Sequence, residues 1–567
     1  MKAKQLAKNL WQVKTSSYEI NVDTAAARAA VIVDGCEAAG LDLRSAVNML
    51  DELDHVIIDA EPNVPRFVGI SEQGGECVFR FESTSSLWQK EYVLCCTPLR
   101  FCYAVSVSGE GAVDSVNYFS GDIACAGHGS QHEFAEGFYP LTPWKPEDSY
   151  FFKPWQSNKR WNVLMVPPMF CYSFRMSGIS RRLALGLCAR RGEHNFNSFD
   201  YNSCKNGRGG GFFLSTDQSG HTHVSGKWSA PEVIGYAASD DMDALRRYSD
   251  YYFTAGLAPR KPQTTPPRFW QGPMACGWIE QCLKAASMDM REASALCRQD
   301  FYEEYCLNLK KHDLHPTALI IDDKWQAEYA TAQVDIERWP DMRGFIDRRH
   351  AEGIKTILWF KLWDSEGWDK ELCLTDSKGS MRIDPSHPKF IAMLKDTIHR
   401  LLSSDAGCLD ADGFKLDFAF IIPMGHSVKT YSGKYGCELM YDYMKLIYDT
   451  AKAVKPDALI NCSPCHPYFA NVCDQARLHD YDERRRDCTD DMTRRAEIFA
   501  IANPHTLLDT DNAGFDTRRD TMRWLLRQGE VGVPDLYALS GGDLTDDDLE
   551  ELAAYWREYS ARIDAQR

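Results

Sequence analysis

The sequence has 567 residues, of which 44% are hydrophobic and 26% are charged, the usage of a globular protein rather than a disordered chain. At roughly 150 residues per domain the length allows about four domains, but barrels and sandwiches of about 200–250 residues allow two large ones. The 64 basic and 81 acidic residues give a formal charge of −17, and the longest run of basic residues is 484–486. We therefore expect neither a nucleic acid nor an anionic membrane as a partner.

The N-terminal segment and the cysteines predict a cytoplasmic protein. The first residues are basic but lack the apolar stretch and small-residue cleavage site of a signal peptide, and no run of about 18 apolar residues follows. The 20 cysteines are scattered through apolar runs, which is typical of free thiols in a reducing compartment. The pair Cys462 and Cys465 has no second C-x-x-C, so we predict no metal site, and nothing in the sequence indicates a cofactor.

The first half of the chain predicts an antiparallel β-sandwich. Between about residues 29 and 230, short alternating apolar runs such as AAVIVDG, RFVGIS and ECVFRFES are separated by turn residues. Residues 242–254 form an amphipathic pattern that predicts a helix, and the proline-rich APRKPQTTPPR follows it. We expect a sandwich domain with its connecting helix over 1–255, a linker over 256–268 and a second domain over 269–567.

The second half alternates short apolar runs with helical patterns. The strand candidates are PMACGWI, ALIIDD, KTILWFKL, DGFKLDF, ALINCS, QARLHD, HTLLDT and DLYALS. Helices are predicted near 290–311, 342–352, 388–403 and 435–454. Eight such strands over about 300 residues predict an α/β fold, a (β/α)8 TIM barrel preceded by the sandwich. A doubly wound sheet is the alternative, but no G-x-G-x-x-G follows the first strand.

Polar residues gather where the predicted barrel strands end, the place where barrels carry their chemistry. They are Asp322 and Asp323 after ALII, Trp359 and Lys361 after TIL, Lys415 and Asp417 in GFKLDF, Cys462 in INCS, Arg477 and Asp480 in QARLHD, and Asp509 and Asp511 in LLDTD. Any single Asp could be a helix cap, but acids on this many strands indicate a site. Carboxylates beside aromatic rings suit glycoside hydrolysis, in which one carboxylate attacks the anomeric carbon and another protonates the leaving oxygen.

Four of these segments resemble motifs of glycoside hydrolase clan D, and most of all the family 36 α-galactosidases and their raffinose-synthase relatives. IIDDKW at 320–325 is similar to that family's DDGW motif, and ILWF at 357–360 to its LWFEPE segment. FKLDF at 414–418 resembles the KWD motif of the nucleophile, and QARLHD at 475–480 aligns without gaps on the acid/base motif QIWTSD. The resemblance extends to the predicted sandwich and its connecting helix.

The resemblance implies a role for each matching residue. Asp417 would be the nucleophile and Asp480 the general acid/base, with Asp482 of HDYDER as the competing acid. Asp322 and Asp323 would bind sugar hydroxyls, Trp325 and Trp359 would form walls, and Lys415 would donate to a hydroxyl. Lys361, Cys462 and Arg477 complete the expected substrate-binding set. The sequence departs from the family at Lys361, which replaces a Glu, and at Leu416, which replaces a Trp.

The predicted function is a retaining α-glycosidase that hydrolyses terminal α-galactosides by double displacement. The alternatives are another clan D specificity (α-N-acetylgalactosaminidase, α-glucosidase or α-galactosyl transferase) and a non-catalytic carbohydrate-binding protein. The expected partner is an oligosaccharide or other glycoside, while the linkage, the natural substrate and any homo-oligomeric state stay open.

An aromatic segment between Phe138 and Trp161 allows two interpretations. It holds eight aromatic residues and several prolines, which disfavour a continuous strand. Its rings either pack the interface between sandwich and barrel, or at least one of them reaches the barrel mouth and covers the substrate.

Overall fold

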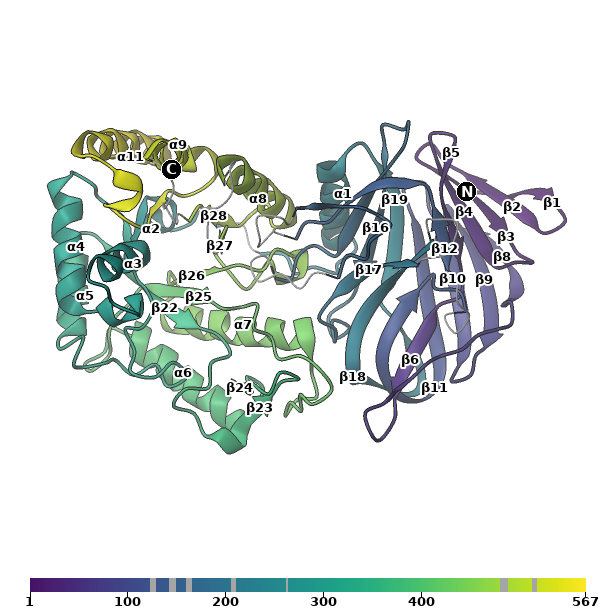
Figure 1. Ribbon diagram of the computed structural model, residues 1–567, viewed down its shortest axis with the longest axis horizontal. Helices are drawn as coiled ribbons and strands as arrows, with labels where there is room; N and C mark the ends of the chain where they lie inside the picture. The colour runs from purple at the N-terminus through teal and green to yellow at the C-terminus, as the bar shows by residue number, and fades with distance from the viewer. Residues whose placement is uncertain are drawn as a thin grey trace.

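The computed structural model describes residues 1–122, 129–141, 149–159, 166–204, 211–261, 264–479, 488–511 and 518–567. The two acid candidates Asp480 and Asp482, and the aromatic residues Trp144 and Trp161, lie outside these ranges. The chain forms an N-terminal body of β-strands and a C-terminal body of strands and helices, which lie side by side (Figure 1). The predicted fold class, a sandwich followed by a TIM barrel, is confirmed.

In the part of the chain that the structure describes, the N-terminal body is an antiparallel sheet structure of 19 strands. Alternation of polar and apolar residues in RAAVIV of β4 and QKEYVLCC of β10 buries one face of each of these two strands. The two longest strands, β11 and β18, pair along most of their length, and β11 also pairs with β6, β10 and β19. The strands are β1 (Lys4–Ala7), β2 (Leu10–Lys14), β3 (Glu19–Asp23), β4 (Arg28–Val33), β5 (Cys36–Asp42), β6 (Ala46–Leu50), β7 (Val56–Ile57), β8 (Arg66–Gln73), β9 (Glu76–Thr84), β10 (Gln89–Cys96), β11 (Phe101–Tyr118), β12 (Ser130–His132), β13 (Phe134–Phe138), β14 (Phe151–Phe152), β15 (Cys171–Met176), β16 (Arg182–Cys188), β17 (Phe199–Cys204), β18 (Gly211–Ser229) and β19 (Glu232–Ala238).

The C-terminal body is built on eight parallel strands, which correspond one to one to the eight predicted segments. They are β20 (Met274–Cys276), β21 (Ala318–Ile321), β22 (Lys355–Lys361), β25 (Gly413–Asp417), β26 (Leu459–Cys462), β27 (Gln475–Arg477), β28 (Leu507–Asp509) and β29 (Asp535–Leu536). Val533, just before β29, donates to the Leu508 carbonyl at 2.7 Å and accepts from the Thr510 amide at 3.2 Å. These bonds join β28 to the segment of β29 and close the barrel. A small hairpin, β23 (Cys373–Thr375) and β24 (Met381–Ile383), follows β22.

Helices cover most of the barrel wall. They are α1 (Asp241–Thr254), α2 (Arg268–Gln271), α3 (Trp278–Ser287), α4 (Gln299–Lys311), α5 (Met342–Ala351), α6 (Pro388–Leu402), α7 (Gly436–Val454), α8 (Cys488–Ala502), α9 (Arg518–Leu525), α10 (Gln528–Val531) and α11 (Asp546–Gln566), with 3-10 turns η1 (Ala293–Leu296), η2 (Lys370–Leu372), η3 (Pro467–Phe469) and η4 (Gly541–Asp543). Local signals set several starts: α6 begins at a proline, and Thr545 and Asp548 form a capping box on α11. Within the described ranges, no helix has both the length and the apolar character that crossing a membrane demands.

One barrel strand is not followed by an α-helix of its own. Residues 463–474, all described, connect β26 to β27 and contain only the turn η3. The connecting helix α1 packs against η3 and α8, so it occupies this side of the barrel (Figure 1). Helix α1 therefore supplies part of the outer helix layer, where a regular (β/α)8 barrel would have a helix between its own strands.

A chain of hydrogen bonds fixes this contact. The His466 Nδ1 atom accepts from the Tyr468 amide at 3.1 Å, so Nε2 carries the proton and donates to the Tyr248 hydroxyl at 3.0 Å. Tyr248 in turn donates to the Leu187 carbonyl at 2.6 Å. Burial lowers the pKa of His466 well below its ordinary value, so the ring is neutral. The bonds thus join the barrel, α1 and the sandwich strand β16 in one buried line.

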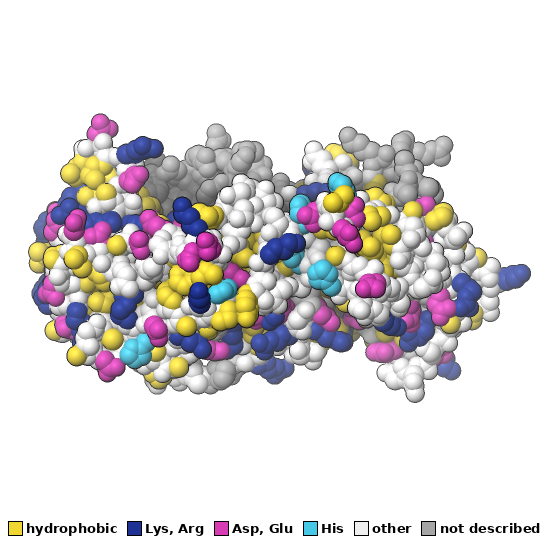
Figure 2. Space-filling view, turned by 90° about the horizontal axis from the view of Figure 1, so that it is seen from below, with side chains coloured by type: hydrophobic (Ala, Val, Ile, Leu, Met, Phe, Trp, Pro, Cys, Tyr) yellow, Lys and Arg dark blue, Asp and Glu magenta, His cyan; other side chains and the backbone are white. Residues whose placement is uncertain are grey.

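Charges of both signs are mixed on the surface. Seen from below, acidic and basic side chains alternate over the barrel and the sandwich (Figure 2). The described residues on this face form no broad area of basic charge.

We predict that Tyr248→Phe destabilises the protein by about 1–3 kcal/mol, because it leaves the buried His466 N–H without an acceptor. Urea unfolding measures the change. Tyr251→Phe on the same helix is the control, since its half-buried hydroxyl makes no hydrogen bond with a described residue, and it should change the free energy of unfolding by less than about 0.5 kcal/mol. Equal effects of the two substitutions would contradict the role given to Tyr248.

Candidate active site

Register between neighbouring strands brings the predicted residues to one end of the barrel. Lys415 pairs with Trp359 across β22 and β25, and Asp417 pairs with Lys361. Residues two apart on a strand point to the same side, so these four side chains share the barrel interior. Gly413 starts β25 at φ +151°, and a Cβ atom there would lie 2.1 Å from the Leu459 carbonyl oxygen. Glycine therefore lets β25 approach β26 closely enough to bring Asp417 into this cluster.

Asp417 is held by three hydrogen-bond donors. Its Oδ1 atom accepts from Arg477 Nη1 at 3.1 Å and from the Phe418 amide at 2.7 Å, and its Oδ2 atom accepts from Trp359 Nε1 at 3.1 Å. Burial acts to raise the pKa of Asp417, but the charge of Arg477, together with smaller contributions from Lys415 and the Phe418 amide, outweighs burial and holds that pKa below its ordinary value. Asp417 is thus a fixed carboxylate that stays ionised at neutral pH.

Arg477 serves a second carboxylate. Its side chain is 4% exposed, and its Nε atom lies 2.6 Å from Asp511 Oδ2. Despite burial, the Arg477 charge also lowers the pKa of Asp511. One guanidinium therefore links the ends of β25 and β28.

Lys415 and Asp322 form a second buried ion pair below Asp417. Lys415 Nζ lies 2.6 Å from Asp322 Oδ2, which also accepts from Cys276 Sγ at 3.1 Å. Burial opposes the charge of Lys415, but the Asp322 carboxylate, together with smaller contributions from Cys276 and Asp511, outweighs burial and raises the Lys415 pKa. The two predicted hydroxyl-binding residues are brought together, and in this structure they bind each other.

Asp323 differs from the other acids of the cluster. Its Oδ1 atom accepts from the Tyr329 hydroxyl at 2.8 Å. Burial, with smaller contributions from the Asp322 and Asp417 charges, raises the pKa of Asp323 to about 6. Lys361 acts in the opposite direction; it pairs with Asp364 at 2.9 Å and lies 4.0 Å above the Tyr329 ring. Asp323 is therefore the described acid of the mouth that gains a proton just below neutral pH.

The two predicted aromatic walls are buried. The Trp325 indole donates to the Trp359 carbonyl at 2.8 Å, and the two side chains are 0% and 1% exposed. Trp359 touches Asp417 directly, whereas Trp325 supports Trp359 from behind. Within the cluster, Trp359 is thus the ring positioned beside the candidate nucleophile.

Cys462 does not join the cluster. Asn461, in register with Lys415, faces the barrel interior and donates to Asp509 Oδ2 at 2.6 Å. Cys462 therefore faces outward, where it contacts Cys473, and burial raises its pKa. The structure gives no support to the expected contact between Cys462 and substrate.

Several residues of the site were not singled out from the sequence. Tyr329 lies in the loop after Trp325, and Asp535 and Tyr537 lie on or next to β29. The Tyr537 ring is 4.8 Å from Lys415 Nζ, and burial with the charge of Asp509 raises the pKa of Asp535 well above its ordinary value. The sequence predicts DLYALS as the eighth strand. The alternation of side chains along that strand was therefore the available signal that Asp535 and Tyr537 face the same side.

His479 lies directly before the acid candidate Asp480. Its side chain is 2% exposed, neither ring nitrogen has a hydrogen-bond partner among the described residues, and its φ is +68°. Burial, followed by the charge of Arg477, lowers the pKa of His479 to about 3, so the imidazole is neutral. The position of Asp480 itself lies outside the described residues.

One group with the ligands for a metal lies away from this site. Asp347, His350 and Asp410 have potential ligand atoms within 4.8 Å of one another. Asp410 already pairs with Lys455 at 2.7 Å, and the group precedes Gly413 at the opposite end of β25 from Asp417. The donors are thus committed to ion pairs, and the group does not belong to the cluster.

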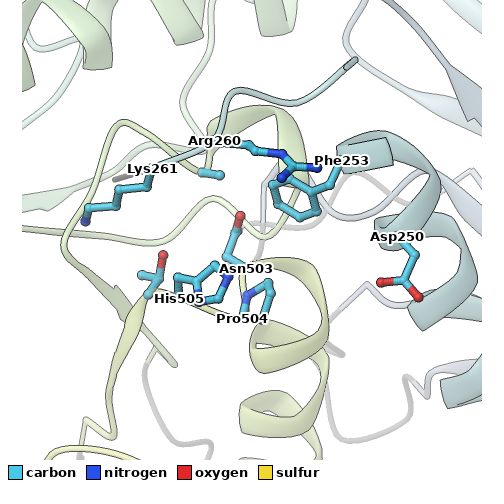
Figure 3. A pocket seen from close by; sticks show the side chains of 9 residues that line it. Asp250, Phe253, Arg260, Lys261, Asn503, Pro504 and His505 are labelled. Carbon is cyan, nitrogen blue, oxygen red and sulfur yellow. The ribbon is translucent and has the colours of Figure 1, made fainter. Parts of the chain in front are cut away.

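A cavity of about 410 Å³ lies at that opposite end as well. It is bounded by Phe253 of α1, by Arg260 and Lys261, and by Asn503 and His505 in the connection from α8 to β28 (Figure 3). Connections from helix to strand meet at the N-terminal ends of barrel strands, where conserved features usually serve stability. We therefore separate this cavity from the candidate active site.

The fold is a sandwich joined to a TIM barrel, with carboxylates at the strand ends. No protein-family model matches the sequence, and no curated protein matches it. Solved structures do match: a GH31 family sulfoquinovosidase from E. rectale superposes with a TM-score of 0.60 at 13% identity, over 99% of this chain and 83% of that one.

Two further structures give the same result. An alpha-galactosidase from Thermus thermophilus in complex with stachyose has a TM-score of 0.52 at 13% identity, over 87% of this chain and 99% of that chain. The cycloalternan-forming enzyme from Listeria monocytogenes has a TM-score of 0.52 at 11% identity, and this chain spans 57% of its length. Identities this low establish a shared fold.

We predict a pH-dependent effect of Asp323→Asn on stability. The folded protein keeps Asp323 protonated up to about pH 6, whereas an unfolded chain ionises it near pH 3.9, so wild-type stability falls between these values as pH rises. Asn cannot ionise and still accepts from Tyr329, so the variant should gain about 2–3 kcal/mol relative to wild type above pH 6 and nothing below pH 4. Thermal unfolding at both pH values measures the difference.

The exposed Glu337→Gln is the control and should change the melting temperature equally at both pH values. A shift for Asp323→Asn that does not depend on pH would show that burial is not what raises the pKa of Asp323.

Proposed function

We propose that this protein is a retaining α-glycosidase that acts by double displacement. The observation that carries the proposal is Asp417, an ionised carboxylate oriented by Arg477, Trp359 and the Phe418 amide at the end of a barrel strand. A nucleophile in this chemistry must stay deprotonated and must not rotate. Both requirements are met by its three donors.

In the first step Asp417 attacks the anomeric carbon while Asp480 gives its proton to the leaving oxygen, which yields a glycosyl ester and a free alcohol. In the second step Asp480 takes a proton from water, the water oxygen attacks the anomeric carbon, and the ester bond breaks to restore the Asp417 carboxylate. Arg477 helps both steps because it also pairs with Asp511. When esterification removes the charge of Asp417, the buried guanidinium still has a carboxylate partner.

The substrate class we propose first is the terminal α-galactoside. Support comes from the motif resemblance and from the shared fold with an alpha-galactosidase solved in complex with stachyose. Asp322, Asp323 and Lys415 are the proposed partners of the sugar hydroxyls. Lys361 beside Asp417 is the departure that bears on specificity, because a cation replaces the family's Glu.

A panel of nitrophenyl α-glycosides tests the substrate class. It should include the galactoside, glucoside and N-acetylgalactosaminide, and also a sulfoquinovoside, since a fold neighbour is a sulfoquinovosidase. Release of nitrophenol and of the free sugar are measured together, so that transfer to an acceptor is separated from hydrolysis. We expect the highest kcat/KM for the α-galactoside; turnover of none of these substrates would contradict the proposal.

Replacing the nucleophile should abolish turnover without unfolding the protein. Asp417→Asn keeps the size of the side chain but cannot attack, so we expect kcat to fall on the order of 10⁶-fold, the scale of losing the nucleophile of a serine protease. In Asp417→Ala, azide should restore activity and give the β-glycosyl azide, because azide attacks from the vacated face. Wild-type-like turnover in Asp417→Asn would reject this assignment.

The leaving group distinguishes the two acid candidates. Asp480→Ala should slow alkyl α-glycosides about 10²–10⁴-fold and slow dinitrophenyl glycosides much less, because a weakly basic leaving oxygen needs no proton. Asp482→Ala is the matched control and should have a small effect on both. If the two variants exchange these phenotypes, Asp482 is the acid.

A further inference from the structure

A buried arginine outside the reaction cluster contacts the backbone that leads to Asp480. Arg495 lies on α8 and is 0% exposed. Its Nη1 atom donates to the Leu478 carbonyl at 3.1 Å and to the His479 carbonyl at 3.2 Å. Two consecutive carbonyls bound by one guanidinium fix the direction in which the chain leaves β27.

The backbone held in this way is strained. His479 has φ +68°, in the left-handed region, which costs a residue other than glycine on the order of 1–2 kcal/mol. Its ring makes no hydrogen bond in return with any residue that the structure describes. Strain of this kind persists where the surroundings over-determine it, most often at functional sites. The bonds from Arg495 to the two carbonyls help to stabilise this conformation.

The other edge of the Arg495 guanidinium is connected to the sandwich through Asp491 and Tyr150. Its Nε and Nη2 atoms lie 3.0 and 2.9 Å from Asp491 Oδ2, and Asp491 Oδ1 accepts from the Tyr150 hydroxyl at 3.1 Å. Tyr150 precedes β14, is 6% exposed and stacks on Phe138 at 6.0 Å. A continuous line of contacts therefore joins the sandwich to the residue before Asp480.

We propose that Arg495 is a positioning residue for the general acid: it holds residues 478–479, which directly precede Asp480 in the chain, and Tyr150 fixes it from the sandwich through Asp491. The inference rests on the proposed function and adds a role for the first domain in the acid step. Misplacing a catalytic group by about 1 Å can cost on the order of 100-fold in rate. Loss of Arg495 should therefore weaken protonation of the leaving group more than attack by Asp417.

The kinetic test uses α-glycosides graded by the basicity of their leaving groups. Arg495→Gln should lower kcat/KM by about 100-fold for an alkyl glycoside and by less than about 3-fold for a dinitrophenyl glycoside. Arg495→Lys should recover part of the loss, and Tyr150→Phe, which removes one hydrogen bond, should show the same trend on a smaller scale. An equal loss for all leaving groups would overturn the proposal, because it would mean that Arg495 only supports the fold.

Arg494 provides the matched control on the same helix. Its guanidinium lies 5.7 Å from the Tyr150 ring and 5.8 Å from the Phe151 ring, so Arg494→Gln perturbs the same interface. It should not change the dependence on the leaving group. If the dependence of kcat/KM on leaving-group basicity changes equally in Arg494→Gln and Arg495→Gln, the proposal is also overturned.

Hydrogen exchange gives a readout that needs no activity. In Arg495→Gln, the amides of residues 478 and 479 should exchange at least about tenfold faster than in wild type, while those of β25 stay unchanged. Unchanged exchange in this segment would overturn the positioning role even if activity fell. Faster exchange in a protein that hydrolyses no glycoside would retain the positioning of residues 478–479 and reject the proposed function. If Arg495→Gln does not fold, the same measurements on Tyr150→Phe decide.

Discussion

The barrel mouth depends on one buried cation, Arg477, which is shared by two carboxylates from different strands. Without it, Asp417 and Asp511 would be buried anions with no cation between them, and each would have to take up a proton. The contact of Arg477 with Asp511 matters as much as its contact with Asp417. If the guanidinium were paired with Asp417 alone, it would lose its only counter-charge when Asp417 is esterified. A lysine could supply the charge but not the two fixed directions of the fork.

The same arrangement of paired charges continues down the barrel. Lys415 neutralises Asp322 one layer below, and Asp509 accepts from Asn461. At the level of β29 the arrangement changes: burial and the neighbouring charges raise the pKa values of both Asp509 and Asp535, which favours the neutral form of these two acids. The barrel interior thus combines ion pairs with acids of raised pKa, where most barrels use branched apolar side chains.

The eight barrel strands could be predicted because each is a short apolar run that ends in polar residues, as in ALIIDD and GFKLDF. The same alternation brought Lys415 and Asp417 to one side correctly. In INCS the sequence predicts that Cys462 faces the site, but the register puts Asn461 inside the barrel and Cys462 outside. Only the pairing of β25 with β26 reveals this. Tyr329 and His479 could not be predicted, because their positions depend on loop conformation. For His479 that conformation is left-handed, and no local sequence pattern indicates it.

The use of α1 to cover the barrel beside η3 has a consequence for the history and the engineering of this chain. Because α1 precedes the proline-rich linker and yet forms part of the outer layer of the barrel, the barrel is not an independent module that begins at the linker. Recombination at that linker would separate Tyr248 from His466 and leave an apolar side of the barrel in water. Exchange of whole catalytic units between relatives should therefore preserve the join between α1 and the barrel, with crossovers falling upstream of residue 241 rather than in the linker.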